Sequence, residues 1–359
     1  MPLQSKSLSQ LAFKKFRHNT VGMISSIFIL FCGFVAVFCY PLAPDDSNFA
    51  NQMHLEIHSK PPGFEVQMLR LPPLQEKETS WIDFLINGNN NSGTEIPILS
   101  YTIKGENLEI IKYADGLAKE YPLTRIHHQP ATYITQKTFH FGTDKYGRDL
   151  LSRLIIGTRI SFSIGFIAVF ISLFIGIFVG ATAGYFGGKI DTFIMWIINI
   201  TWSIPTLLLV IAITLALGKG FWQVFIAVGL TMWVEVARVV RGQVITTKQQ
   251  QYVEAAKALG FSDFRIIFRH ILPNIMAPII VISAANFAGA ILIESGLSFL
   301  GIGAQPPTPS WGAMIKNHYN YIILGKPFLA LIPGIAIMSL VMAFMLLGNA
   351  LRDALDVKN

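Results

Sequence analysis

The stretch from Tyr252 to Pro273 reads YVEAAKALGFSDFRIIFRHILP and is a long polar, basic segment inside an otherwise apolar second half of the chain. Strong helix formers from Gln249 to Leu259 predict a helix that stops at Gly260, since glycine suits the left-handed conformation that ends helices. Ser262 is placed to cap a second short helix, and Pro273 is expected to close it. The stretch therefore predicts a sharply bounded helical elbow between two apolar runs.

The composition around this elbow is typical of a membrane protein. The chain has 359 residues, of which 52% are hydrophobic and only 14% charged. Apolar runs of about 20 residues are what a bilayer requires of a spanning helix. The net charge of +7 does not indicate nucleic-acid binding, because the basic residues lie beside apolar runs and are not interleaved with aromatic residues in a polar patch.

The apolar runs predict an all-α polytopic membrane protein with six spans and an external α+β insertion between the first and second spans. We expect a cytoplasmic segment at 1–19, a first span at 20–40, the insertion at 41–156, a five-helix core at 157–350 with the polar loop 242–273, and a tail at 351–359. The core spans are predicted near 157–184, 192–217, 221–241, 276–298 and 328–349. Lys and Arg concentrate in the segments assigned inside, which predicts cytoplasmic termini.

The insertion has its own predicted structure. Ile96 to Lys104 and Leu108 to Tyr113 flank Gly105-Glu106-Asn107 and predict a β-hairpin. An ordered insertion without a ligand of its own is favoured over a binding domain.

Small residues recur along one face of the second span. Ser172, Gly176, Gly180 and Gly184 follow one another in steps of four, which allows another helix to approach closely. This packing seam is expected either inside the chain or against another subunit.

Charged and helix-breaking residues inside spans are the candidates for a transport path. Pro205 in the third span and Pro278 in the fifth are expected to kink or begin helices. Glu235 is expected to pair with Arg238 one turn away. Glu294, toward the outer end of the fifth span, is expected either to contact solute or to brace the following loop.

Signals of catalysis are missing from the sequence. It contains no GxxxxGK[ST] nucleotide-binding loop, no GxSxG and no HExxH. Its two cysteines, Cys32 and Cys39, lie roughly 10 Å apart on one predicted helix, too far for a disulfide, and no Cys/His cluster has metal-ligand spacing. We therefore expect a non-enzymatic chain without a metal, and we interpret the elbow as a docking surface for a separate motor protein.

Four stretches together resemble the OppC/DppC-type permeases of peptide and nickel ABC importers, over residues 10–45 and 138–357. They are YVEAAKALG with the later ILP, HFGTDKYGRDLLSR at 140–153, LSFLGIGAQPPTPSWG at 297–312 and LGNALRDALD at 347–356. The resemblance implies that the elbow is the "EAA" coupling loop of that family. Its implied ATPase-coupling residues are Tyr252, Glu254, Ala255, Ala256, Leu259, Gly260, Phe261 and Pro273, with the two alanines allowing a partner to approach closely.

The resemblance also implies partners. These are an OppB/DppB-like permease in a heterodimer, two cytoplasmic ABC ATPase subunits that hold ATP and Mg, and an external solute-binding protein or lipoprotein, all at a bacterial inner membrane. No cofactor is expected on this chain itself. The implied cargo is a di- or oligopeptide, with nickel or another small chelate as the alternative. A membrane-anchored receptor or assembly protein and a proton-coupled transporter are the alternatives from other classes.

The chain also departs from the family pattern. Trp196 and Asn199 stand where the family usually has Arg and Asp, so both charges of a structural pair are replaced together. The C-terminal stretch has Asn349 and Val357 where Asp and Pro are common, and the external segment is unusually long. Asn199, Pro205 and Glu294 are the residues expected to border the translocation path.

Overall fold

A computed structural model describes residues 8–72, 80–89, 93–113, 116–122, 133–218 and 220–355; Val357 lies outside this range. The chain divides into two compact units. Unit 1 consists of residues 1–32, 161–305 and 337–359, and unit 2 of residues 33–160 and 306–336. The segment 306–336 thus groups with the insertion, whereas the sequence placed it within the five-helix core.

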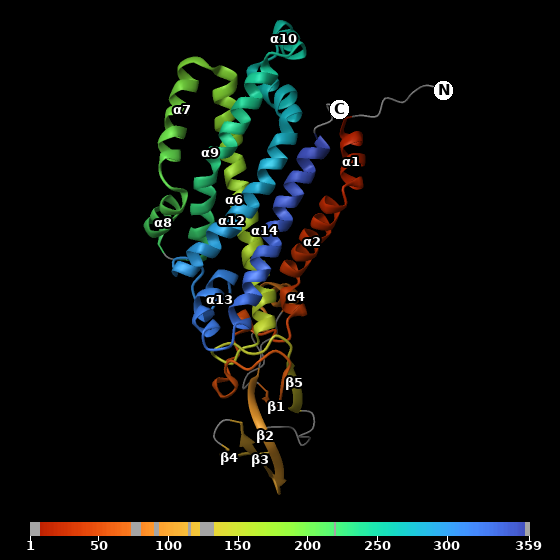
Figure 1. The fold of residues 1–359 in the computed structure, drawn as a ribbon, viewed down its shortest axis with the longest axis vertical. Helices are drawn as coiled ribbons and strands as arrows, with labels where there is room; N and C mark the ends of the chain where they lie inside the picture. Colours follow the sequence, from red (N-terminus) through yellow and green to blue (C-terminus); the bar gives the residue numbers. More distant parts are fainter. Residues whose placement is uncertain are drawn as a thin grey trace, which may run out of the picture. The chain divides into compact units, whose positions relative to one another are not determined.

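Among the described residues, five helices are long and apolar enough to cross a membrane, or six if one bent pair counts as a single span. Four of the five are continuous α-helices, namely α2 (Thr20–Val37), α6 (Leu150–Phe186), α9 (Phe221–Lys248) and α14 (Phe328–Leu355), and the fifth runs from Asp263 to Leu300 (Figure 1). A short basic helix, α1 (Leu8–His18), precedes α2. These helices confirm the predicted polytopic, mainly helical fold.

The third predicted span, 192–217, is broken rather than continuous. Helix α7 (Gly188–Ser203) and helix α8 (Thr206–Leu217) meet at an angle of 92°. Pro205 disfavours the helical conformation of the residue before it, and Ile204 is accordingly extended. Pro205 therefore ends one helix and begins the next.

The small-residue face of α6 packs inside unit 1 against α9. A Cβ added at Gly176 would lie 2.5 Å from Cβ of Val236, and one added at Gly180 would lie 2.4 Å from the carbonyl oxygen of Ala237. A Cβ added at Gly184 would lie 2.8 Å from the carbonyl oxygen of Arg241, and Ser172 is fully buried. The seam is thus an internal contact in which only glycine allows the two backbones to approach this closely.

Unit 2 contains a five-stranded antiparallel sheet in the order β4-β3-β2-β1-β5. The strands are β1 (Phe64–Leu71), β2 (Thr94–Lys104), β3 (Asn107–Lys112), β4 (Ala118–Pro122) and β5 (Ile134–Phe139). Strands β2 and β3 confirm the predicted hairpin, and Gly105 supplies the left-handed turn residue, although Asn107 already pairs with Lys104.

Besides the sheet and the adjoining ends of α2, α6 and α14, the described part of unit 2 contains short helical segments. They are α3 (Cys39–Leu42), η1 (Asn48–Ala50), η2 (Leu55–Ile57), α4 (Trp81–Asn87), α13 (Trp311–His318) and η6 (Tyr319–Ile322). The indole nitrogen of Trp311 donates to the carbonyl oxygen of Leu154 at 3.0 Å. This bond fastens the late segment 306–336 to the beginning of α6 within the same unit.

Candidate functional site: a coupling elbow and a buried charge cluster

The elbow lies between α9 and α12 (Met276–Leu300), both in unit 1. It begins with α10 (Gln251–Ala258) and turns at Gly260, whose φ is +77°. The short helix α11 (Asp263–Arg265) follows, with Ser262 at the N-cap position but without a capping bond from its side chain. The predicted end of the first helix and the glycine turn are where the sequence placed them.

The expectation that Pro273 closes the second helix is wrong. A π-helical turn, η4 (Ile266–Ile271), and a 3-10 turn, η5 (Leu272–Ile275), carry the chain into α12 (Met276–Leu300) without a break. Proline lacks an N–H and therefore disrupts an ordinary helix interior, but here it lies in the first turn of η5, where no donor is needed. The elbow and α12 consequently form one continuous element.

The elbow is anchored to unit 1 by apolar packing and polar contacts. Val253, Ala256, Ile266 and Ile271 are buried in one cluster with side chains of α6 and α9. The hydroxyl of Tyr185, at the end of α6, donates to Oδ1 of Asp263 at 2.6 Å. Ala256 is only 4% exposed, so the expectation that it lets a partner approach is wrong: it fills the core beneath the elbow.

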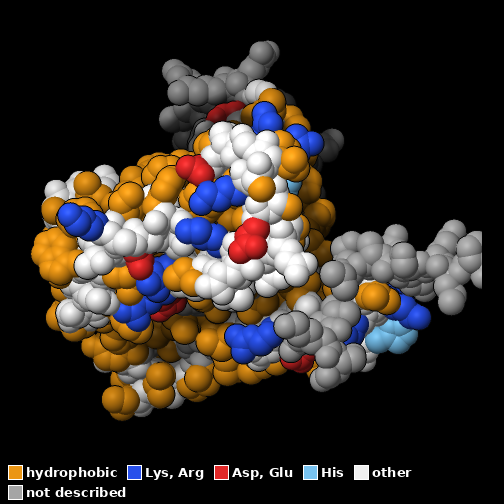
Figure 2. Space-filling model, turned by 90° about the horizontal axis from the view of Figure 1, so that it is seen from above, with side chains coloured by type: hydrophobic (Ala, Val, Ile, Leu, Met, Phe, Trp, Pro, Cys, Tyr) orange, Lys and Arg blue, Asp and Glu red, His pale blue; other side chains and the backbone are white. Residues whose placement is uncertain are grey.

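The outer surface of the elbow combines apolar and basic side chains. Leu259 is 74% exposed and Phe264 70% exposed. The exposed residues beside them are Tyr252, Glu254, Ala255, Lys257, Gly260, Arg265, Phe268 and Arg269. Figure 2 shows Lys and Arg side chains gathered over this end of the molecule. Large exposed apolar side chains rimmed by charge are typical of a protein-binding surface.

Sequence analysis missed Phe264 and Phe268 as members of this surface. Their rings lie 4.3 Å apart between centroids, as expected for residues four positions apart on a helix. The i, i+4 spacing of two phenylalanines in a polar stretch was the available signal. Two further residues were predicted to couple to the ATPase. Phe261 is half-buried and stacks on His270, and Pro273 is exposed.

The charges predicted to pair within α9 do not do so. The Arg238 guanidinium donates to Oδ1 of Asn199 at 2.7 Å and lies 3.6 Å from the Trp202 ring centroid, both on α7. The expected pair with Glu235 is therefore wrong, because α7 offers Arg238 an acceptor and an aromatic face. Asn199 takes this role at the position where the resemblance leads one to expect Asp.

Glu294 is fully buried in α12. Its carboxylate accepts from Ser298 Oγ at 2.6 Å, and the same Oγ accepts from the backbone N–H of Ala304 at 3.2 Å. Of the two expectations for Glu294, these contacts favour the one in which it braces the loop that follows α12.

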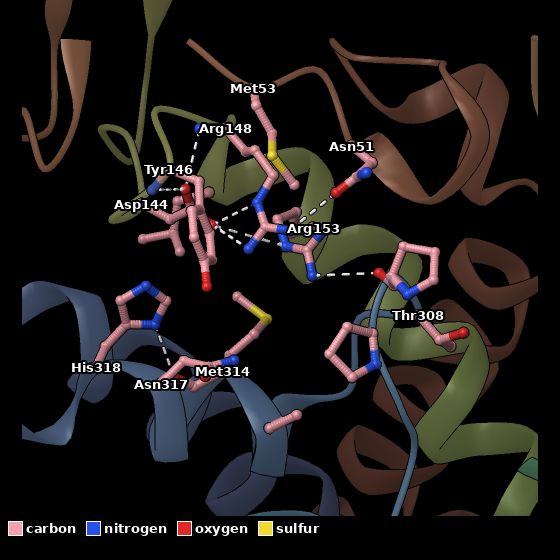
Figure 3. A pocket seen from close by; sticks show the side chains of 14 residues that line it. Asn51, Met53, Asp144, Tyr146, Arg148, Arg153, Thr308, Met314, Asn317 and His318 are labelled. Atoms are coloured by element: carbon pink, nitrogen blue, oxygen red, sulfur yellow. Dashed lines mark hydrogen bonds and ion pairs between the residues drawn. The ribbon is translucent and has the colours of Figure 1, made fainter. Parts of the chain in front are cut away.

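A second cluster of functional interest lies in unit 2, where HFGTDKYGRD folds into a tight turn. Asp144 is fully buried and accepts from Arg148 Nε at 2.7 Å, with a second guanidinium contact at 2.6 Å. Arg148 also donates to Asn51, and Arg153 lies 3.9 Å from the same carboxylate. Figure 3 shows these side chains around a pocket of about 290 Å³.

His318 closes one side of this pocket and is 2% exposed. Its Nδ1 bonds the carbonyl oxygen of Met314 at 2.7 Å, while the backbone N–H of Lys145 donates to Nε2 at 3.4 Å. Burial lowers the pKa of His318 below its ordinary value of 6.5, and it also lowers the pKa of His54 in the same unit. The cluster therefore holds a histidine with a lowered pKa beside a buried ion pair, an arrangement that fixes the turn.

Comparison with known proteins identifies the family. Residues 172–358 match the family described as "Binding-protein-dependent transport system inner membrane component", and residues 7–62 match "N-terminal TM domain of oligopeptide transport permease C".

The dipeptide transport system permease protein DppC of Alkalihalophilus pseudofirmus is 43% identical over 218 residues, which cover 61% of this chain and 71% of that protein. The glutathione transport system permease protein GsiD of Pectobacterium atrosepticum is 42% identical over 217 residues, covering 60% and 72%. A solved methionine ABC transporter, MetNI, aligns with 56% of this chain, covering 96% of its own, at 19% identity and a TM-score of 0.44.

The chain belongs to the family of binding-protein-dependent transport system inner membrane components. It is a multi-pass inner-membrane permease subunit of an ABC transporter.

Proposed function

We propose that this permease subunit forms half of the translocation path of an ATP-driven importer for di- and oligopeptides. The names of its relatives support the cargo, since one is a dipeptide permease and the other a glutathione permease, and glutathione is itself a short peptide. Asn199 and Pro205 border the proposed path at the broken span, whereas Glu294 braces the loop after α12.

The elbow is the observation that carries the proposal. Its outer surface exposes Leu259, Phe264 and basic side chains, while its inner face is anchored to α6 through Tyr185 and Asp263. A partner that moves the outer surface therefore moves α12, because the two form one continuous element. Such a joint suits transmission of a two-state change from a motor subunit to the membrane helices.

The partners follow from this role. Two cytoplasmic ABC ATPase subunits, which bind ATP and Mg, dock on the elbow of this chain and of an OppB/DppB-like permease, its heterodimeric partner. An external solute-binding protein or lipoprotein delivers the peptide. Both termini and the elbow then lie in the cytoplasm and the sheet of unit 2 lies outside. In this scheme the chain holds no nucleotide and performs no catalysis itself.

The test is peptide uptake by cells that carry the complete importer. Gly260→Pro should abolish uptake, since proline cannot adopt the φ of +77° found at this turn. Glu254→Lys should reduce uptake at least tenfold, while both variants remain in the membrane. Glu106→Lys, at the exposed hairpin turn, is the control. Wild-type uptake in both elbow variants, or failure of the chain to purify with an ATPase, would contradict the proposal.

A further inference from the structure

The break between α7 and α8 borders a pocket of about 250 Å³ within unit 1. Thr201 and Trp202 line it from α7, Thr231 and Glu235 from α9, and Asn286 and Gly289 from α12. Irregular backbone at membrane depth is tolerated where it is buried in protein or lines a cavity, and broken helices often surround transported solutes. A volume of this size exceeds the roughly 30 Å³ share of one water molecule.

Asn286 supplies a donor that no protein group satisfies. Its side chain is only 2% exposed, and its Nδ2 has no hydrogen-bond partner. Buried amide groups almost always have a partner, because an unpaired buried donor costs free energy. Since this donor lines a pocket, a ligand oxygen can satisfy it.

Glu235 supplies an acceptor in the same pocket. Its side chain is exposed, and it forms none of the ion pairs found among the described residues. Arg238, one turn away, is held instead by Asn199 and the Trp202 ring. This arrangement keeps the nearest cation of α9 occupied and leaves the Glu235 carboxylate available to a cation from outside the chain.

We propose that this pocket is a transient subsite for the amino-terminal end of a peptide in transit. Glu235 accepts from the terminal ammonium group, and Asn286 Nδ2 donates to the first carbonyl oxygen. An ammonium group and a peptide carbonyl are neighbours in every unblocked peptide. Glu235 and Asn286 therefore recognise the peptide backbone and do not contact its side chains. This inference rests on the proposed import function and assigns the residues that contact the cargo.

The first experiment measures ATP-dependent uptake of dialanine by the complete importer in proteoliposomes. Glu235→Gln and Asn286→Leu should each lower the rate at least fivefold without loss of ATPase activity, and Glu235→Asp should restore most of it. Thr214→Val is the matched control, because Thr214 Oγ1 is also buried without a partner but lies outside the pocket. It should stay within twofold of wild type.

The second experiment tests occupancy with the pocket groups intact. In the assembled complex, with Cys32 and Cys39 replaced by alanine, Thr201→Cys places a thiol in the pocket. Millimolar dialanine should slow its reaction with a small maleimide at least threefold, whereas N-acetyl-dialanine should not. Thr246→Cys is the control, since Thr201 and Thr246 each bond the carbonyl oxygen four residues earlier and Thr246 lies outside the pocket. Its labelling should not respond to either peptide.

The outcomes separate the subsite from the import function. Dialanine uptake by wild type, combined with unchanged uptake in Glu235→Gln and Asn286→Leu, would overturn the subsite and leave the importer assignment standing. Equal losses in Thr214→Val, or equal protection by both peptides, would also overturn it. Should Asn286→Leu fail to assemble, the labelling experiment decides alone. Wild-type proteoliposomes that import no dialanine would overturn both proposals.

Discussion

Tyr185 and Asp263 are joined by a 2.6 Å hydrogen bond across 78 positions of sequence. Tyr185 lies at the end of α6, and Asp263 begins α11. The ammonium group of Lys248 donates to the backbone carbonyl oxygen of the same tyrosine. One tyrosine therefore ties a membrane helix to both sides of the elbow.

Removing this hydroxyl should loosen the elbow without unfolding the chain. Tyr185→Phe is expected to cost about 1 kcal/mol of stability, the net contribution of a typical hydrogen bond, and to lower uptake per ATP hydrolysed several-fold. The ratio of uptake to hydrolysis in proteoliposomes is the measurement. Tyr101→Phe, at an exposed position of β2, is the control. An unchanged ratio in Tyr185→Phe would show that the bond plays no part in coupling.

The exposed phenylalanine of α11 should be essential for docking. Phe264→Ala is expected to reduce the ATPase recovered with the permease at least tenfold, because a large apolar side chain at a contact carries much of the binding energy. Phe174→Ala serves for comparison, since Phe174 is 72% exposed but lies in the apolar helix α6. Equal ATPase recovery from the two variants would remove Phe264 from the docking surface.

The buried ion pair of unit 2 should be more costly to break than to remove. Arg148→Met leaves the fully buried Asp144 carboxylate without its closest cation and is expected to destabilise unit 2 by roughly 3–5 kcal/mol. Adding Asp144→Asn should recover part of that loss, since it removes the buried carboxylate that Arg148→Met leaves without its closest cation; the recovery stays partial because Arg153 then loses its own ion pair with Asp144. Thermal unfolding of the purified complex measures both. A double variant less stable than Arg148→Met would contradict this account.

Stability of unit 2 should fall in acid. Because burial lowers the pKa of His318 below 6.5, the unfolded chain takes up its proton before the folded chain does. The contribution of His318 is thus fully present above pH 6.5 and is lost as the pH falls below that value. Melting temperatures at pH 7.5 and 5.5 should differ more in wild type than in His318→Leu. Equal differences would rule out His318 as a source of acid sensitivity.

The seam between α6 and α9 should not accept even one methyl group. Gly180→Ala would place Cβ 2.4 Å from the carbonyl oxygen of Ala237, so it should force the helices apart and lower the melting temperature of the complex. Gly296→Ala is the matched control, because nothing lies within 4 Å of its added Cβ. Alanine favours a helix interior over glycine by about 1 kcal/mol, so this control should be neutral or stabilising.

Local chemistry made the elbow predictable. The run of helix formers and Gly260 determine where α10 ends, and both act within a few residues. The passage through Pro273 was not predictable in the same way. A proline usually stops a helix, whereas here it follows a π-helical turn whose Ile266 and Ile271 are buried in the core.

Partners distant in sequence were the main source of error. Glu235 is the nearest acid to Arg238 along the chain, yet the guanidinium of Arg238 donates to Asn199 of α7, 39 positions away in sequence. The same limit hid Asn286, since an amide in an apolar run carries no sign of whether a pocket adjoins it. A single sequence predicts contacts between residues on the same helix from their spacing. It does not predict these contacts, because they depend on how separate helices cross.

The composition of unit 2 has a consequence for biosynthesis. Trp311 and the carbonyl group of Pro307 contact Leu154 and Arg153, but residues 161–305 must be made between the two parts of this unit. At ribosomal rates of about 5–20 residues per second, this interval lasts roughly 7 to 29 seconds. The early part of unit 2 therefore lacks its contacts with the late segment while residues 161–305 are synthesised. A newly made chain is most exposed to proteases and aggregation during that delay.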